Sequence, residues 1–261
     1  MLRTWNPENI KPMIPFCAAM VGNRRSGKSF LQFYVLDTVL KDEFDLYISF
    51  CGSVSCSPDL RRFFQSKGLE HLMFERVTVK FLETLMKQQE YLKTNNLGRR
   101  RILLLLDDAE LDKHEQQYLG TFCTRARHFD VSIFQCSVSY TQLAKNFRRS
   151  LDILFLFQMS MYSDRKLLLQ EFSSNPKLSH YAMQDLQKYQ CMVQEKNFTS
   201  ELFYFKIETP NQCEESKKNL ELLLSSNEKD ISETCPDADV ERENTESVVE
   251  SDQILENEFH I

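Results

Sequence analysis

VGNRRSGKSF, residues 21–30, contains two of the six glycines of this 261-residue chain. Gly22 and Gly27 stand in the spacing G-x-x-x-x-G-K-S, which is typical of a phosphate-binding loop. In such a loop the glycines let successive backbone N–H groups point at phosphate oxygens, beside the N-terminus of a helix. Lys28 then reaches the β- and γ-phosphates, and the Ser29 hydroxyl binds magnesium. The stretch therefore predicts a site for a nucleotide triphosphate and Mg²⁺.

The whole loop and the first residues of the following helix are expected to contact the nucleotide. Arg24 and Arg25 either add positive charge next to phosphate or face solvent. The alternative to a nucleotide site is a plain glycine turn before a helix. The predicted nucleotide contacts are Gly22, Asn23, Arg24, Arg25, Ser26, Gly27, Lys28, Ser29 and Phe30.

Apolar runs alternate with segments of helical periodicity along most of the chain, which predicts a mostly parallel sheet covered by helices on both faces. Ligands of such α/β folds bind at the carboxyl ends of the strands. The predicted strands are residues 13–21, 45–51, 72–77, 102–106, 131–136, 151–157, 190–194 and 201–207. The predicted helices are residues 29–40, 79–92, 111–129, 163–172 and 178–188, with residues 52–70 irregular and then helical, and 137–150 a polar, basic connection.

Two carboxylates follow the apolar run ILLLL of residues 102–106. Asp107, at the end of a buried strand, is predicted to hold the magnesium shell. Asp108 is predicted to orient or deprotonate the water that attacks the nucleotide. The alternative for Asp108 is that it caps the following turn.

Charge divides the chain into two parts. Residues 213–261 hold 15 acidic and 4 basic side chains, which leaves 23 acidic and 28 basic side chains in residues 1–212, a net charge of +5. We expect an ATPase domain over residues 1–210 and an acidic, disordered tail over residues 211–261. The tail is either a solvated extension or a transient shield over the basic body. No run approaches the roughly eighteen apolar residues of a membrane span, and no signal peptide is expected.

A series of segments in one order resembles the genome-packaging ATPases of large double-stranded DNA viruses and related virus-like elements, a poxvirus-type branch of the FtsK-HerA group. The segments are VGNRRSGKS, ILLLLDD, RARHFDVSIFQCSVSY, LAKNFRRS and LDILFLF. The phosphate loop and the acidic strand end are common to all P-loop NTPases, and the later segments narrow the resemblance. It covers about residues 13–208.

The resemblance implies a RecA-like ATPase that assembles as a ring of about five or six subunits and threads duplex DNA into a preformed capsid. It implies ATP and Mg²⁺ as ligands, and double-stranded DNA, further copies of the chain and a capsid or portal-vertex protein as partners. It places the protein in the host-cell cytoplasm or nucleus at the site of virion assembly, or in the virion itself. No nuclease signature is present, so any DNA cutting would belong to another protein.

Site residues follow from the resemblance position by position. Arg127 matches the arginine just before the fourth core strand, which acts as a finger on the neighbouring subunit's nucleotide, and Arg125 is the alternative. Asp107 matches the magnesium-side acid and Asp108 the catalytic acid. The phosphate loop is matched by Gly22, Gly27, Lys28 and Ser29.

One position departs from the family pattern. Val138 stands where relatives have a polar sensor, most often glutamine, and valine cannot form the required hydrogen bond. Either Ser137 or Gln135 substitutes for it, or hydrolysis is weakened. Candidate DNA contacts are Lys145, Arg148 and Arg149, which are expected to touch DNA or a neighbouring subunit, and with less support Arg61, Arg62 and residues 99–101.

Two other classes of function are compatible with the sequence. A nucleoside or small-molecule kinase uses the same phosphate loop, but the paired acids at a strand end and the lack of an arginine-rich lid argue against it. A nucleotide-gated assembly or scaffold protein would bind ATP and hydrolyse it weakly, as Val138 would allow.

Overall fold

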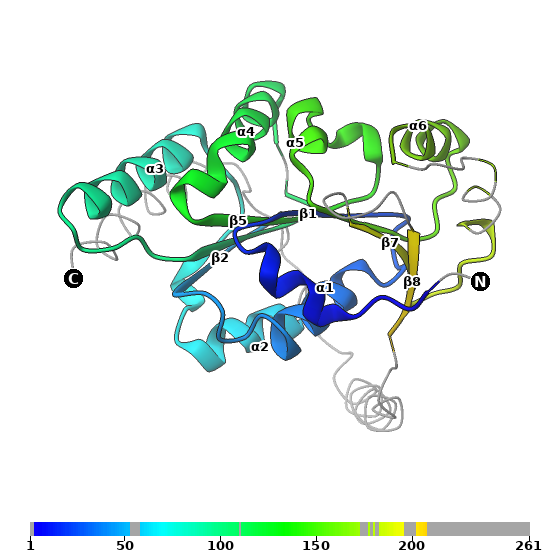
Figure 1. The fold of residues 1–261 in the computed structure, drawn as a ribbon, viewed down its shortest axis with the longest axis horizontal. Helices are drawn as coiled ribbons and strands as arrows, with labels where there is room; N and C mark the ends of the chain where they lie inside the picture. Colours follow the sequence, from blue (N-terminus) through cyan, green and yellow to red (C-terminus); the bar gives the residue numbers. More distant parts are fainter. Residues whose placement is uncertain are drawn as a thin grey trace, which may run out of the picture.

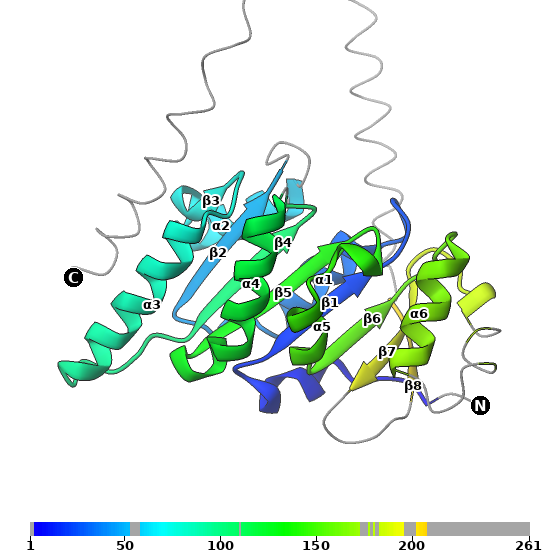
Figure 2. The ribbon, with the colours of Figure 1, turned by 90° about the horizontal axis from the view of Figure 1, so that it is seen from above.

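The computed structural model describes residues 3–52, 58–109, 111–172, 177, 180, 183–195 and 202–207. One eight-stranded sheet has the order β3-β2-β4-β5-β1-β6-β7-β8 (Figure 2). The strands from β3 to β6 are parallel, β7 is antiparallel to β6, and β8 is antiparallel to β7. Their bounds are β1 Cys17–Val21, β2 Leu46–Cys51, β3 Met73–Phe74, β4 Ile102–Asp107, β5 Val131–Ser137, β6 Ile153–Leu156, β7 Gln190–Glu195 and β8 Leu202–Lys206.

Helices cover both faces of the sheet. In Figure 1, α1 and α2 lie on one face, and α3, α4, α5 and α6 lie on the other. The α-helices are α1 Lys28–Thr38, α2 Pro58–Lys67, α3 Val79–Thr94, α4 Lys113–Ala126, α5 Lys145–Ser150 and α6 Tyr162–Phe172. Short 3-10 helices occupy η1 Pro7–Met13, η3 Glu70–Leu72, η4 Arg127–Phe129 and η5 Tyr140–Gln142. The predicted α/β architecture with a mostly parallel sheet is confirmed.

The central strands are buried along their whole length, which explains their continuous apolar runs. Every residue of β1, β2, β4, β5 and β6 is buried. Such burial is expected when both faces of a parallel sheet are covered by helices. The sheet is therefore the rigid base on which the loops at its edges are held.

Several element boundaries differ from those predicted. β1 begins at Cys17 and not at residue 13, because Pro12 lies in η1 and Pro15 has no N–H to donate to a neighbouring strand. The strand predicted over residues 72–77 is reduced to the two residues of β3. The connection over residues 137–150 contains the short helices η5 and α5. The helix predicted over residues 178–188 lies partly outside the described residues.

The N-terminal segment is part of the core, which the sequence did not indicate. The Trp5 side chain is buried, and its indole N–H donates to Glu195 at 2.7 Å. The Trp5 backbone N–H donates to the carbonyl of Tyr204 at 2.8 Å. Residues 3–5 therefore lie beside β8. The predicted tail, residues 211–261, lies outside the described residues, and no described helix is long and apolar enough to cross a membrane.

Candidate nucleotide site

The predicted phosphate loop connects the end of β1 to the start of α1, at the edge where the parallel strands end. The Asn23 N–H donates to the carbonyl of Gln158 at 2.9 Å, and the Asn23 side-chain oxygen accepts from the backbone and hydroxyl of Ser160, both at 3.0 Å. A side chain at Gly22 would place its Cβ only 2.5 Å from the Cβ of Phe157. The segment after β6 therefore packs directly on the loop and fixes its start.

Gly27 ends the loop in a conformation that other residues rarely adopt. Its φ is 112°, and it precedes the first helical residue, Lys28. A Cβ on Gly27 would also lie 2.9 Å from the ring of Tyr189, whose backbone N–H donates to the Ser26 carbonyl at 3.0 Å. Backbone geometry and close packing thus both require glycine at this position.

Lys28 and Ser29 lie where a phosphate-loop lysine and serine are needed. The Lys28 ammonium is buried and donates to the carbonyls of Gly22 at 2.9 Å and Asn23 at 3.0 Å. The Ser29 hydroxyl donates to the Asp107 carboxylate, with oxygen separations of 3.2 and 3.4 Å. The structure thereby joins the loop to the acid at the end of β4, 78 residues further along the chain.

The residues present fit a magnesium ion. Asp107 is 7% exposed, and burial, followed by the charge of Asp108, raises the pKa of its carboxyl, against the opposing effects of Ser29 and Lys28. A cation beside this carboxylate would relieve that cost, and magnesium prefers such oxygen ligands. No group of three His, Cys, Asp or Glu side chains able to hold a metal occurs within the described residues. Magnesium at Ser29 and Asp107 would therefore take its other ligands from water and phosphate, as it commonly does.

Asp108 turns the chain away from β4. Its φ is 47°, in the left-handed region, and its side chain is exposed. Asp108 and Arg24 are the two residues that line both of two neighbouring cavities. The predicted catalytic acid is therefore placed beside the loop, at the boundary between these spaces.

The first cavity, about 370 Å³, lies over the phosphate loop. The Phe30 and Tyr189 rings lie 5.2 Å apart at its wall, and the Lys188 ammonium is 4.7 Å from the Tyr189 ring centroid. Its lining combines basic and hydroxyl side chains that can bind phosphate with two aromatic rings on which a flat group can stack. Its lining is Arg24, Arg25, Gly27, Lys28, Ser29, Phe30, Asp108, Lys188 and Tyr189.

The second cavity, about 580 Å³, lies beside Asp108 at the ends of β4 and β5. Val138 lines it, as do both predicted substitutes for the missing sensor, Gln135 and Ser137. A further polar group is Gln142, whose side-chain oxygen accepts from the Ser137 hydroxyl at 3.1 Å. Val138 thus shares this cavity with polar side chains and with Asp108.

Arg127 does not lie with the other predicted site residues. It belongs to η4 and forms an ion pair with Asp152 at 3.4 Å, while half of its side chain remains exposed. Asp152 accepts a hydrogen bond from the N–H of Cys17, at the start of β1. The length of β1 therefore separates Arg127 from the phosphate loop of its own chain. Arg125 lies over the ring of Phe129, at the same edge of the sheet.

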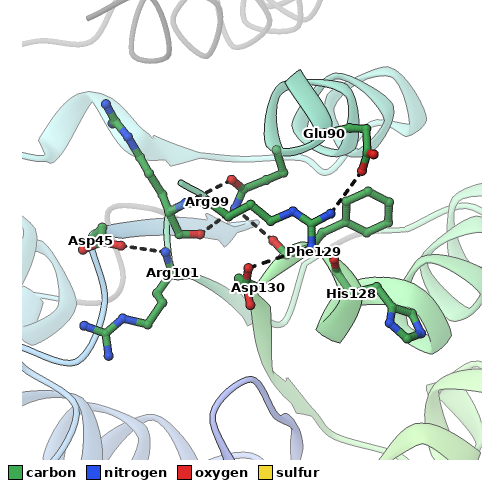
Figure 3. A network of polar contacts seen from close by, with 9 residues as sticks. Asp45, Glu90, Arg99, Arg101, His128, Phe129 and Asp130 are labelled. Carbon is green, nitrogen blue, oxygen red and sulfur yellow. Dashed lines mark hydrogen bonds and ion pairs between the residues drawn. The ribbon is translucent and has the colours of Figure 1, made fainter. Parts of the chain in front are cut away.

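The basic run at residues 99–101 also lies at that opposite edge. Figure 3 shows Arg99 between Glu90 and Asp130, with ion pairs of 3.1 and 4.0 Å, and Arg99 also donates to the carbonyl of His128. Its guanidinium lies over the ring of Phe129. Arg99 therefore braces the starts of β4 and β5.

The other predicted DNA contacts differ in how exposed their side chains are. Arg148 is largely buried, stacks on Tyr140 at 5.0 Å and pairs with Glu171 at 3.9 Å. Lys145 and Arg149 on the same helix are exposed. Arg61 and Arg62 are exposed on α2, and Arg62 pairs with Asp59 at 3.5 Å. The structure leaves α5 and α2 with solvent-facing positive charge.

Several residues at the site were missed by sequence reasoning, namely Gln142, Ser160, Lys188 and Tyr189. No spacing rule connects them to the loop. The topology connects Lys188 and Tyr189 to the loop, because β7 is antiparallel to β6 and therefore begins at the edge where β1 and β6 end. This brings the residues just before β7 onto the phosphate loop.

Solved structures with the same architecture include viral packaging ATPases. The DNA-packaging ATPase B204 of Sulfolobus turreted icosahedral virus has a TM-score of 0.55 at 14% identity, over 76% of this chain and 100% of that one. The genome-packaging NTPase B204 of Sulfolobus turreted icosahedral virus 2, in complex with AMP, has a TM-score of 0.54 at 16% identity, over 78% of this chain and 100% of that one. The chain has the fold of these packaging ATPases. The predicted RecA-like P-loop fold is thereby confirmed.

The fold is also shared with a secretion ATPase. The cytoplasmic domain of the type VII secretion ATPase EccC of Thermomonospora curvata has a TM-score of 0.53 at 10% identity, over 75% of this chain but 24% of that one. No family model matches the sequence, and no curated protein matches it either.

Proposed function

We propose that this chain is an ATP-hydrolysing motor that moves double-stranded DNA into a viral capsid. The observation that carries the proposal is the contact of 3.2 Å between Ser29 and Asp107, which joins the phosphate loop to the acidic strand end beside Lys28 and Asp108. The fold shared with the B204 packaging ATPases supports the same function.

The reaction is the hydrolysis of ATP to ADP and phosphate. Water attacks the γ-phosphorus, the bond from that phosphorus to the β–γ bridging oxygen breaks, and the bond's electrons leave with ADP. Asp108 orients the water and accepts its proton, while Lys28 holds the β- and γ-phosphates. Magnesium held by Ser29 and Asp107 would neutralise phosphate charge. The site residues thus serve mainly to position the reactants and to stabilise charge.

A ring of about five or six subunits is part of the proposal. The half-exposed Arg127 guanidinium lies at the edge of the sheet opposite the loop, where a neighbour's nucleotide is easier to reach than its own. The net charge of +5 over residues 1–212 suits contact with duplex DNA. We propose a capsid or portal-vertex protein as the docking partner, at the virion assembly site in the host cytoplasm or nucleus or in the virion.

A nucleotide-gated scaffold is the second candidate, because the valine at position 138 removes the expected polar sensor. A monomeric kinase is the third, since the cavity beside Asp108, about 580 Å³, has room for an acceptor molecule. These alternatives differ from the motor in turnover and in oligomeric state.

Phosphate release by the purified chain, with and without duplex DNA, tests the proposal. A motor gives turnover that duplex DNA stimulates and that Lys28→Ala and Asp108→Asn abolish. Tight ATP binding without turnover would favour the scaffold. Gel filtration with and without ATP adds the oligomeric state, because a kinase would remain a monomer under both conditions.

A further inference from the structure

Arg24 occupies a place that no other arginine of the described residues shares. It is the second residue after Gly22, its side chain is exposed, and it lines both the cavity over the loop and the cavity beside Asp108. No hydrogen bond or ion pair holds its guanidinium within the part of the chain that the structure describes. The two cavities therefore meet at one free positive charge and one carboxylate.

The junction of the cavities is also where the reacting phosphate belongs. Lys28 and Ser29 line only the loop cavity, and Ser29 contacts Asp107 at the end of β4. The terminal phosphate of a nucleotide held by these residues lies on the side toward Asp108, because that acid must reach the attacking water. A guanidinium at this boundary can contact the terminal phosphate without competing with Lys28.

Other arginines near the site are less suited to this contact. Arg25 lines only the loop cavity, and Arg76 lines only the second cavity and pairs with Glu115 at 3.4 Å. Arg127 is held by Asp152 at the opposite edge of the sheet. Arg24 is thus the arginine whose own chain places it between the phosphate loop and the predicted catalytic acid.

We propose that Arg24 contacts the γ-phosphate of ATP bound in its own subunit and stabilises the negative charge that develops there during hydrolysis. The proposal rests on the proposed ATP hydrolysis and adds to it a positive group that acts within one subunit. Since ADP lacks the γ-phosphate, Arg24 distinguishes ATP from ADP. A charge positioned in this way at a transferring phosphate typically accelerates the reaction by about 100-fold or more.

The test compares Arg24→Ala, Arg24→Lys and Arg25→Ala in the full chain. Arg24→Ala is expected to lower kcat by about 100-fold and to leave the affinity for ADP unchanged, while Arg24→Lys recovers part of the rate. Arg25→Ala is expected to weaken ADP and ATP alike, because Arg25 lines only the loop cavity. Fluorescence of the single, buried Trp5 checks that each variant is folded.

Mixing subunits separates action within a subunit from action between subunits. Lys28→Ala chains keep an intact Arg24 but cannot bind nucleotide, so adding them to Arg24→Ala chains should restore no turnover. Recovery in the mixture, or an unchanged kcat in Arg24→Ala beside an active unmodified chain, would overturn the inference alone. An unmodified chain that binds ATP but never hydrolyses it would overturn the proposed function as well.

Discussion

Asp107 is a site residue whose buried carboxylate lowers the stability of the nucleotide-free protein at neutral pH. Its carboxylate is buried beside a second acid, and burial raises the pKa of the Asp107 carboxyl. A raised pKa means that the folded protein binds this proton more tightly than the unfolded chain does. The contribution of Asp107 to the free energy of unfolding is therefore fully present below the pKa that its carboxyl has in the unfolded chain. It is lost as the pH rises through the higher pKa that this carboxyl has in the folded protein.

Asp107→Asn is accordingly expected to stabilise the nucleotide-free protein at neutral pH. The gain in melting temperature over the unmodified chain should grow as pH rises through the raised pKa of Asp107 and should be smallest in acid. The same variant should lose magnesium-dependent turnover. Thermal unfolding at a series of pH values checks this, and a gain that shrinks with rising pH would contradict it.

Gln142 is the polar group that the structure adds to the two predicted substitutes for the missing sensor, Gln135 and Ser137. Its amide oxygen accepts from Ser137, which leaves the amide N–H₂ available to donate, and Gln142 lines the same cavity as Asp108. We expect Gln142→Ala to lower kcat by about tenfold with little change in KM. The exposed Thr141 provides the control, Thr141→Ala. A rate loss confined to Gln135→Ala or Ser137→Ala would contradict this assignment.

Local sequence was sufficient for the residues that form a continuous motif. The loop from Gly22 to Ser29 was predicted from its spacing, and Asp107 and Asp108 from their place after an apolar run. The structure brings Ser29 and Asp107 into contact. Tyr189 and Gln142 carry no such signal, because their places depend on where β7 begins and how η5 turns. Side chains supplied by distant segments need the fold before they can be assigned.

The phosphate loop packs closely on the residue that follows β6, Phe157. Gly22→Ala would force its new methyl group against Phe157, with a Cβ separation of 2.5 Å before relaxation. We expect a loss of about 1–3 kcal/mol in the free energy of unfolding, together with weaker nucleotide binding. Denaturant unfolding followed by Trp5 fluorescence measures the loss.

Gly98→Asn serves as the control for that measurement. Gly98 has a φ of 74°, which asparagine tolerates, and nothing lies within 4 Å of the position that a Cβ would take. Its substitution should change stability little. Equal losses in the Gly22 and Gly98 variants would show that the contact with Phe157 contributes no stability.

Long, buried elements were the most predictable ones. The strands β4 and β5 and the helix α3 match their predicted ranges within two residues, because apolar runs and helical periodicity determine them directly. The two-residue strand β3 and the six-residue helix α5 carry too few residues for any period to show. The packing of η1 and Trp5 on the sheet was missed, because it depends on the distant β7 and β8.

The charge of the whole chain predicts how its two parts behave. The described residues end at Ile207, just after β8, and residues 213–261 carry 11 more acidic than basic side chains. We expect a chain ending at residue 210 to keep the melting temperature and the ATP turnover of the full chain. If the tail shields the body, the shorter chain should also bind duplex DNA more tightly at low salt. Loss of the folding transition would contradict the predicted boundary.

The most direct test of the account is steady-state ATP hydrolysis by the full chain, with and without duplex DNA, beside Lys28→Ala and Asp108→Asn. The account predicts turnover that duplex DNA increases, that high salt returns to its basal rate, and that both variants abolish. Hydrolysis that continues in Lys28→Ala, or that duplex DNA leaves unchanged at low salt, would contradict a DNA motor built on this phosphate loop.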